Sequence, residues 1–198
     1  MGVYLSVDLD YWRGHKSPNS SNYFFNKVFD LNVPITFVIE HEELLSDIKK
    51  MKDLTSLYNI DYHSDIIGRR DINDIPEDYD WANFVPGRSK AQFVWCMPKN
   101  ECYLNDLGTC HADGDDPFRP QKNSGWKNCQ MMTGLRMIPW DYIDRVGICL
   151  SPCFVNLVSV NPTIERLGLS VKKARKLVEK QPYEAHKRQR GILKEIAA

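Results

Sequence analysis

Residues Asp61, His63 and Asp65 stand at alternate positions directly after the apolar run of residues 54–60. Alternate side chains of an extended chain point to the same side, so all three can face one point. Carboxylate and imidazole ligands suit a hard or borderline divalent ion such as Mn²⁺ or Zn²⁺. This spacing therefore predicts a metal site at the end of a strand.

Two other strand-like runs end in side chains of the same kinds. Residues 3–10 form a β-rich run that ends with two aspartates, and residues 34–41 form an apolar run that ends with a histidine. Ligands bind outside the carboxyl ends of strands in open parallel sheets, so the three ends converge if the strands are neighbours. Six ligands with bridging carboxylates can hold two ions. The candidate metal ligands are Asp8, Asp10, His41, Asp61, His63 and Asp65.

Segments with helical periodicity join these runs. Residues 22–31 repeat apolar side chains at helical spacing, and residues 42–51 form an amphipathic pattern with acids at the start and lysines at the end. The resulting order of strand, helix, strand, helix, strand predicts an α/β fold with a parallel sheet.

The second half of the chain predicts less regular structure. Residues 81–85, 93–97 and 101–104 resemble short strands or a hairpin, and residues 121–133 resemble an irregular flap. Residues 145–150 predict a buried strand, a candidate for a further parallel strand of the sheet. We expect a single domain over residues 1–198, in which residues 163–198 form a basic C-terminal helical extension. That extension either packs a solvated helix on the sheet or contacts an acidic peptide segment such as a leader.

Composition narrows the functional class. A chain of 198 residues is about one domain, and Lys+Arg balances Asp+Glu at 26 each. This neutrality argues against a dedicated nucleic-acid binder. There is no apolar run of transmembrane length and no secretory signal pattern. We therefore expect a cytoplasmic protein without nucleic-acid or membrane partners.

The six cysteines lack C-x-x-C pairing, which disfavours a zinc ribbon.

The motifs carry a family resemblance. Residues 5–10 and 61–65 resemble the two aspartate motifs of the ureohydrolases, the arginase and agmatinase superfamily, and His41 is similar to their lone histidine ligand. A closer resemblance is to the UPF0489 family, some members of which are peptide arginases. It rests on the Glu-His pair that opens residues 40–45, followed by residues 61–65 and then residues 81–85. The D-x-D motif comes first in this chain, whereas it comes last in arginase.

The resemblance implies a three-layer arginase/deacetylase-like fold with a mainly parallel sheet and the metal site at the C-terminal strand ends. It also implies two Mn²⁺ ions, with other divalent ions possible. The implied reaction is hydrolysis of arginine side chains in a ribosomally synthesised precursor peptide, which gives ornithine and urea. The precursor peptide would be the partner.

Such a reaction needs a carboxylate that holds the guanidinium and an acid that protonates the departing amine. Glu40 or Glu43 can supply the carboxylate, and Glu40 is favoured because it neighbours His41. Glu43 can instead stabilise a helix N-terminus. His15 is the candidate proton donor, and His111 is the alternative.

Two other kinds of function compete with this one. One is a different binuclear metallohydrolase, either an amide deacetylase or a phosphoesterase. These would need tandem histidines or a Gly-Asn-His motif, and the sequence contains neither. The other is a peptide-binding module with a vestigial metal site. A structural zinc site is generally closed and tetrahedral, unlike six ligands at an open edge. Metal-dependent release of urea separates the first function from both.

Overall fold

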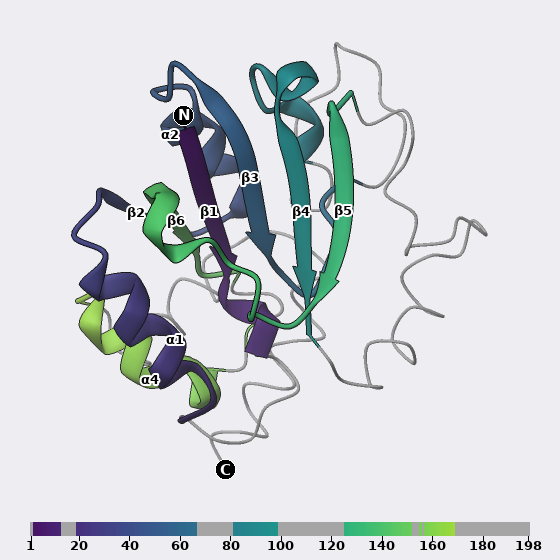
Figure 1. Cartoon of the computed structure of the whole chain (residues 1–198). Helices are drawn as coiled ribbons and strands as arrows, with labels where there is room; N and C mark the ends of the chain where they lie inside the picture. Colours follow the sequence, from purple (N-terminus) through teal and green to yellow (C-terminus); the bar gives the residue numbers. More distant parts are fainter. Residues whose placement is uncertain are drawn as a thin grey trace, which may run out of the picture.

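The computed structural model describes residues 2–12, 19–66, 81–98, 125–151, 155 and 157–168. Six strands form one sheet in the order β2-β6-β1-β3-β4-β5, and every neighbouring pair is parallel (Figure 1). The strands are β1 (Gly2–Asp8), β2 (Ile35–Val38), β3 (Leu54–Ile60), β4 (Gln92–Met97), β5 (Asn128–Thr133) and β6 (Ile143–Cys149). The predicted α/β class and parallel sheet are confirmed.

Helices cover both faces of the sheet. The α-helices are α1 (Asn19–Asp30), α2 (Leu45–Ile48) and α4 (Leu157–Arg166). The 3₁₀ helices are η1 (Leu9–Trp12), η2 (His41–Leu44), η3 (Trp81–Phe84), η4 (Arg88–Lys90) and η5 (Trp140–Tyr142). Helices α1 and α4 pack side by side against one face, and η2 and α2 lie against the other (Figure 1). No helix in the described part of the chain is both long and apolar enough to cross a membrane.

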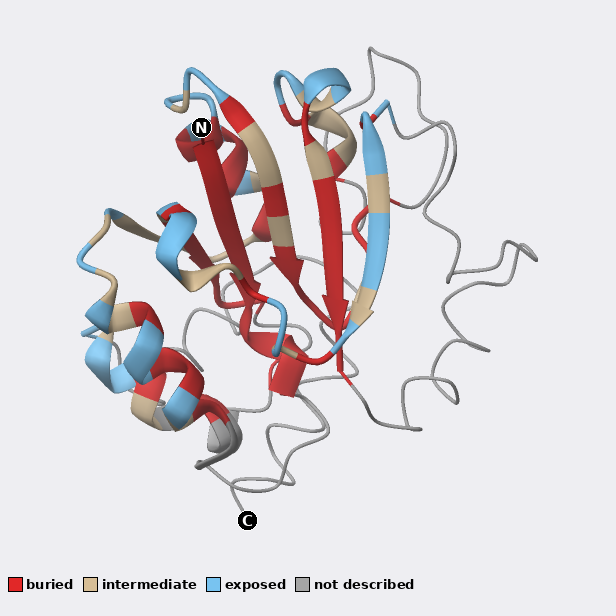
Figure 2. Ribbon diagram, viewed as in Figure 1, coloured by how far each residue is buried: buried red, intermediate tan, exposed pale blue. Residues whose placement is uncertain are grey.

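Strand β1 is buried along its whole length (Figure 2). Because side chains alternate along a strand, Val3, Leu5 and Val7 join the apolar core under α1 and α4, whereas Tyr4 joins the core on the other face. A strand covered on both faces is typical of parallel sheets. The same alternation places Ser6 on the face that carries η2.

Two local predictions are wrong. Residues 81–84 form a 3₁₀ helix rather than a strand, with Trp81 fully buried. Residues 128–133 form the edge strand β5 rather than part of a flap, because hydrogen bonds to β4 hold a segment with mostly exposed side chains. Strands β1 and β2 are not neighbours, since β6 lies between them. All three outcomes depend on long-range contacts that local sequence patterns do not contain.

The expected C-terminal extension begins inside helix α4. Thr163 and Ile164 are buried, and the helix packs against α1. Helix α4 is therefore packed on the rest of the fold through its buried residues. The remainder of the extension, from residue 169, and the predicted strand at residues 101–104 lie outside the described residues.

Candidate metal centre

The carboxyl end of β1 delivers two buried aspartates. Asp8 is the last residue of the strand, and Asp10 follows in η1. The backbone N–H of Asp10 donates to Oδ1 of Asp8 over 2.9 Å, and the N–H of Tyr62 donates to Oδ1 of Asp10 over 3.2 Å. These bonds fix both carboxylates and join the end of β1 to the segment after β3.

The segment after β3 turns instead of continuing as a strand. Residues 61–65 lie in bends, and Asp65 adopts a left-handed backbone with φ 56°. The N–H of His63 donates to Oδ1 of Asp61 over 2.7 Å, and Nδ2 of Asn59 donates to Oδ2 of Asp65 over 3.0 Å. The three predicted ligands therefore meet through a turn held by their own carboxylates. The extended geometry expected from the alternating spacing is wrong.

His41, the first residue of η2, faces the aspartates of both motifs. Its Nδ1 lies 3.2 Å from Oδ2 of Asp8, 3.2 Å from Oδ2 of Asp61 and 3.1 Å from Oδ2 of Asp65. Its Nε2 lies 2.7 Å from Oγ of Ser6. A hydrogen bond to one ring nitrogen orients the other, so the Ser6 contact directs Nδ1 to the carboxylates.

His63 stands on the other side of Asp61. Its Nδ1 lies 3.1 Å from Oδ2 of Asp10 and 3.7 Å from Oδ1 of Asp61. The two oxygens of Asp61 therefore face different histidines. Among the described residues, three groups of side chains could each hold a metal ion: Asp10, Asp61 and His63; His41, Asp61 and Asp65; and Asp8, His41 and Cys149. The structure brings together all six predicted ligands, and their role as ligands stays a prediction.

The last residue of β6, Cys149, and Ser151, which follows the strand, were not identified from the sequence patterns. Ser151 donates from Oγ to Oδ2 of Asp8, the oxygen that faces His41. Its φ is 41°, a backbone conformation that serine rarely adopts. The thiol of Cys149 donates to the backbone oxygen of Ile39 over 3.3 Å and accepts the N–H of Ser151 over 3.3 Å. The only sequence signal for Ser151 is the Ser-Pro break after a buried run.

Two buried tryptophans support the candidate ligands. Trp81 donates from Nε1 to Oδ2 of Asp65 over 2.7 Å, and its ring centroid lies 4.5 Å from that of His41. Trp95 donates from Nε1 to the backbone oxygen of Asp61 over 3.1 Å. Rigid indole rings thus position ligands from β3 and η2 relative to each other.

Burial and mutual repulsion raise the pKa values of three of the aspartates. Burial raises the pKa of Asp8 to about 7, with Asp10 and Asp61 adding to the rise. Burial and the charge of Asp61 also raise the pKa of Asp10, and they raise that of Asp65 well above its usual value. Burial and the neighbouring charges therefore disfavour the ionised form of each of these three carboxylates.

The pKa values of both histidines are also raised, whereas that of Asp61 is lowered. Burial opposes protonation of both rings, yet Asp65, Asp61 and Asp8 raise the pKa of His41 well above its usual value. Asp10 and Asp61 do the same for His63. Burial would raise the pKa of Asp61, but hydrogen bonds from both histidines hold it well below its usual range.

The donor set fits a divalent cation. Four buried carboxylates converge with two imidazoles, and the described residues offer no lysine or arginine contact to any of the four. Oδ2 of Asp10 is buried and accepts no well-aligned hydrogen bond from the described residues. A cation bound among these oxygens would replace the lost hydration and relieve their repulsion.

The structure gives different outcomes for the predicted catalytic residues. The carboxylate of Glu43 accepts the N–H groups of Ile39 and Glu40 over 2.9 and 3.0 Å, so it caps η2. Glu40 is half-buried beside His41, and its role stays a prediction. His15 and His111 lie outside the described residues.

Comparisons with protein-family models, curated proteins and solved structures returned no match.

Proposed function

We propose that this protein is a manganese-dependent hydrolase that converts arginine side chains of a precursor peptide to ornithine and releases urea. One observation supports this function more directly than any other. The carboxylate of Asp61 turns Oδ2 to His41 and Oδ1 to His63, at 3.2 and 3.7 Å from their Nδ1 atoms. One carboxylate shared between two imidazole-carboxylate groups is the arrangement that a pair of neighbouring ions needs.

The donor set favours Mn²⁺ over softer ions. The proposed ligand atoms are carboxylate oxygens and imidazole nitrogens, which suit hard to borderline ions. Asp10, Asp61 and His63 would hold one ion, and Asp8, His41, Asp61 and Asp65 the other. Two such ions would supply Lewis-acid activation of water at neutral pH.

The residues around the ions would orient and protonate the substrate. Water adds to the guanidinium carbon, the bond from that carbon to Nε breaks, and Nε leaves with a proton as the ornithine amine. The other product is urea. The carboxylate of Glu40 would hold the guanidinium by paired hydrogen bonds, and His15 or His111 would give the proton to the leaving nitrogen. The preference for a peptide over free arginine rests on the UPF0489 resemblance.

Mass spectrometry tests this function directly. The Mn²⁺-loaded protein is incubated with an arginine-containing precursor peptide encoded beside its gene and, separately, with free arginine. We expect loss of CH₂N₂ for each arginine converted, with an equal amount of urea released. The Asp61→Ala and His63→Ala variants should show neither change, because each removes a ligand.

Asp30→Ala is the matched control, since it removes an exposed carboxylate at the end of α1. It should retain full activity. Metal content is measured for every variant, so that loss of activity can be traced to loss of the ions. An unchanged peptide mass, with two bound ions per chain, would contradict the proposed function.

A further inference from the structure

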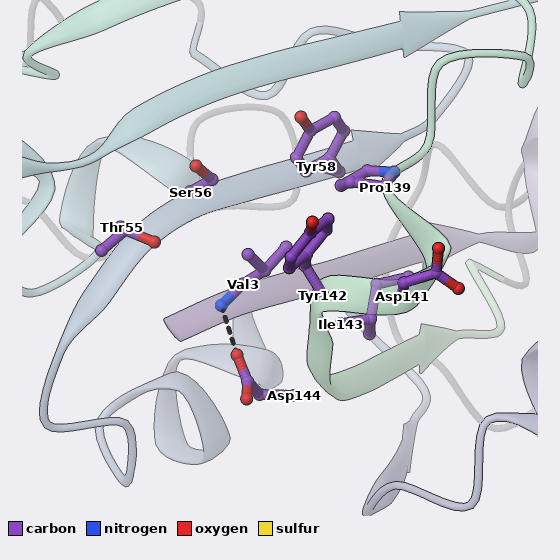
Figure 3. A pocket seen from close by; sticks show the side chains of 9 residues that line it. All are labelled: Val3, Thr55, Ser56, Tyr58, Pro139, Asp141, Tyr142, Ile143 and Asp144. Atoms are coloured by element: carbon purple, nitrogen blue, oxygen red, sulfur yellow. Dashed lines mark hydrogen bonds between the residues drawn. The ribbon is translucent and has the colours of Figure 1, made fainter. Parts of the chain in front are cut away.

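A pocket lies at the end of the sheet opposite the metal centre. It has a volume of about 590 Å³ and is lined by residues of β1, β3 and the turn that leads into β6 (Figure 3). The lining residues are Val3, Thr55, Ser56, Tyr58, Pro139, Asp141, Tyr142, Ile143 and Asp144. Its volume falls within the usual range of about 300–1,000 Å³ for ligand sites.

Two tyrosines give the pocket its aromatic surface. Tyr58 comes from β3 and lies beside Pro139, whereas Tyr142 comes from η5 and lies beside Val3 (Figure 3). Tyr142 is 71% exposed. Tyrosine is enriched where proteins bind partners, because its ring provides contact area and its hydroxyl tolerates water.

Asp141 precedes Tyr142 in η5, and Asp144 follows it at the start of β6. Oδ2 of Asp144 accepts the N–H of Val3 over 2.8 Å, which fixes that carboxylate against β1. Asp141 is exposed at the pocket. The described residues that line the pocket include no lysine, arginine or histidine. The pocket therefore carries negative charge next to its two aromatic rings.

Aromatic rings beside carboxylates bind cations. A guanidinium stacks on an aromatic face and also donates paired hydrogen bonds to a carboxylate, whereas an ammonium binds as a point charge. We propose that this pocket binds an arginine side chain of a peptide, at a position separate from the metal centre. The identity of that peptide as the substrate rests on the proposed function, but the binding chemistry rests on the pocket alone.

The length of the sheet sets the spacing between the two sites. Val3 lines the pocket and Asp8 lies five residues further along β1, so about 17 Å separates these two residues. An extended peptide spans this distance with roughly five residues, and more if it follows the curved surface. The bound arginine would therefore lie at least that far along the chain from the reacting one. The pocket would raise the affinity for the peptide without taking part in the reaction.

Fluorescence anisotropy tests the proposal without any catalysis. The probe is a fluorescein-labelled Gly-Ser peptide that carries arginines spaced along it, titrated with metal-free protein. We expect saturable binding that Tyr142→Ala and Asp141→Asn each weaken about fivefold, which is the size of an exposed cation–π or charge contact. A matched peptide with glutamates in place of the arginines should not bind.

Control variants separate the pocket from general surface effects. Tyr23→Ala removes a tyrosine of α1 that is 73% exposed, and Asp30→Asn removes an exposed carboxylate of the same helix. Both should bind the arginine peptide as the wild type does, and so should Asp61→Ala, which disables the metal centre. Absence of binding by the wild-type protein, unchanged binding by both pocket variants, or loss of binding in Asp61→Ala would each overturn the proposal. Urea release is measured separately, so failure of this pocket and failure of the proposed function give different results.

Discussion

In the part of the chain that the structure describes, buried aspartates occupy two regions, and the charges around them differ. At the metal centre, four buried aspartates meet two histidines. In the other region, Asp47 of α2 is a single, fully buried aspartate that is bound by a tyrosine, an arginine and a lysine. It accepts the hydroxyl of Tyr4 over 3.1 Å, Nη2 of Arg145 over 2.9 Å and Nζ of Lys50 over 3.0 Å.

The pKa values of the two regions follow this difference. Burial acts to raise the pKa of Asp47, but hydrogen bonds from Arg145 and Lys50 outweigh it and lower the pKa. Burial and neighbouring carboxylates raise the pKa values of Asp8 and Asp10. The chain therefore neutralises Asp47 with its own cations and leaves an excess of carboxylates at the metal centre. We infer that the first region stabilises the fold, whereas the second is arranged for an ion from solution.

The largest expected effect is the coupling of stability to Mn²⁺. At about a hundred times its dissociation constant, Mn²⁺ should raise the free energy of unfolding by about 2.7 kcal/mol for each site that only the folded protein forms. Asp61→Ala should abolish this gain. Asp47→Asn should keep it, although its stability without metal is lower. Thermal denaturation with and without Mn²⁺ measures both, and a full gain in Asp61→Ala would contradict the assignment of Asp61 as the shared ligand.

The next effect concerns the self-neutralised region. Asp47→Asn leaves Arg145 without its carboxylate partner, so we expect the free energy of unfolding to fall by about 2 kcal/mol at pH 7. The loss is smaller than for a fully buried pair, because the side chain of Arg145 is 24% exposed and can be rehydrated. Urea denaturation provides the measurement. The exposed Asp30→Asn is the control and should change stability by less than about 0.5 kcal/mol. If the two variants changed the free energy of unfolding equally, Asp47 would have no special role in stabilising the fold.

A smaller effect tests the contribution of β6 to the metal centre. Ser151→Ala removes the hydroxyl that donates to Asp8, so we expect the affinity for Mn²⁺ to fall about tenfold. Ser151→Gly removes the same hydroxyl but accommodates the positive φ of this residue without strain. Both variants should bind Mn²⁺ equally weakly in calorimetric titrations, while Ser151→Gly is the more stable protein. Normal Mn²⁺ affinity in Ser151→Gly would mean that the backbone, not the hydroxyl, positions Asp8.

The smallest effect is the pH dependence of the Asp47 contribution. The pKa of Asp47 is lower in the folded protein than in the unfolded chain, so its contribution is fully present above the unfolded value of about 4. It is lost as the pH falls through the folded pKa. The stability difference between the wild type and Asp47→Asn should therefore be the same at pH 7 and pH 5 and should shrink below about pH 4. A difference that stays constant down to acidic pH would show that the charge of Asp47 does not stabilise the fold.

Local periodicity was sufficient for much of the fold. The apolar run of residues 54–60 is strand β3 with the predicted bounds, and the helical spacing of residues 22–31 corresponds to α1. Such patterns are readable because burial of one face requires a repeat of two in strands and of 3.6 in helices. Edge strand β5 was missed because its side chains are mostly exposed and therefore show no apolar pattern.

The sequence by itself determined which ligand types follow β1 and β3 and that these strands are parallel members of an α/β sheet. Only the tertiary structure decided that β6 lies between β1 and β2, which brings Ser151 to Asp8. It also decided that the two oxygens of Asp61 face different histidines. The physical reason is that strand order and side-chain orientation depend on packing between segments far apart in the chain. A ligand motif is local, but the direction in which each oxygen points depends on everything packed around it.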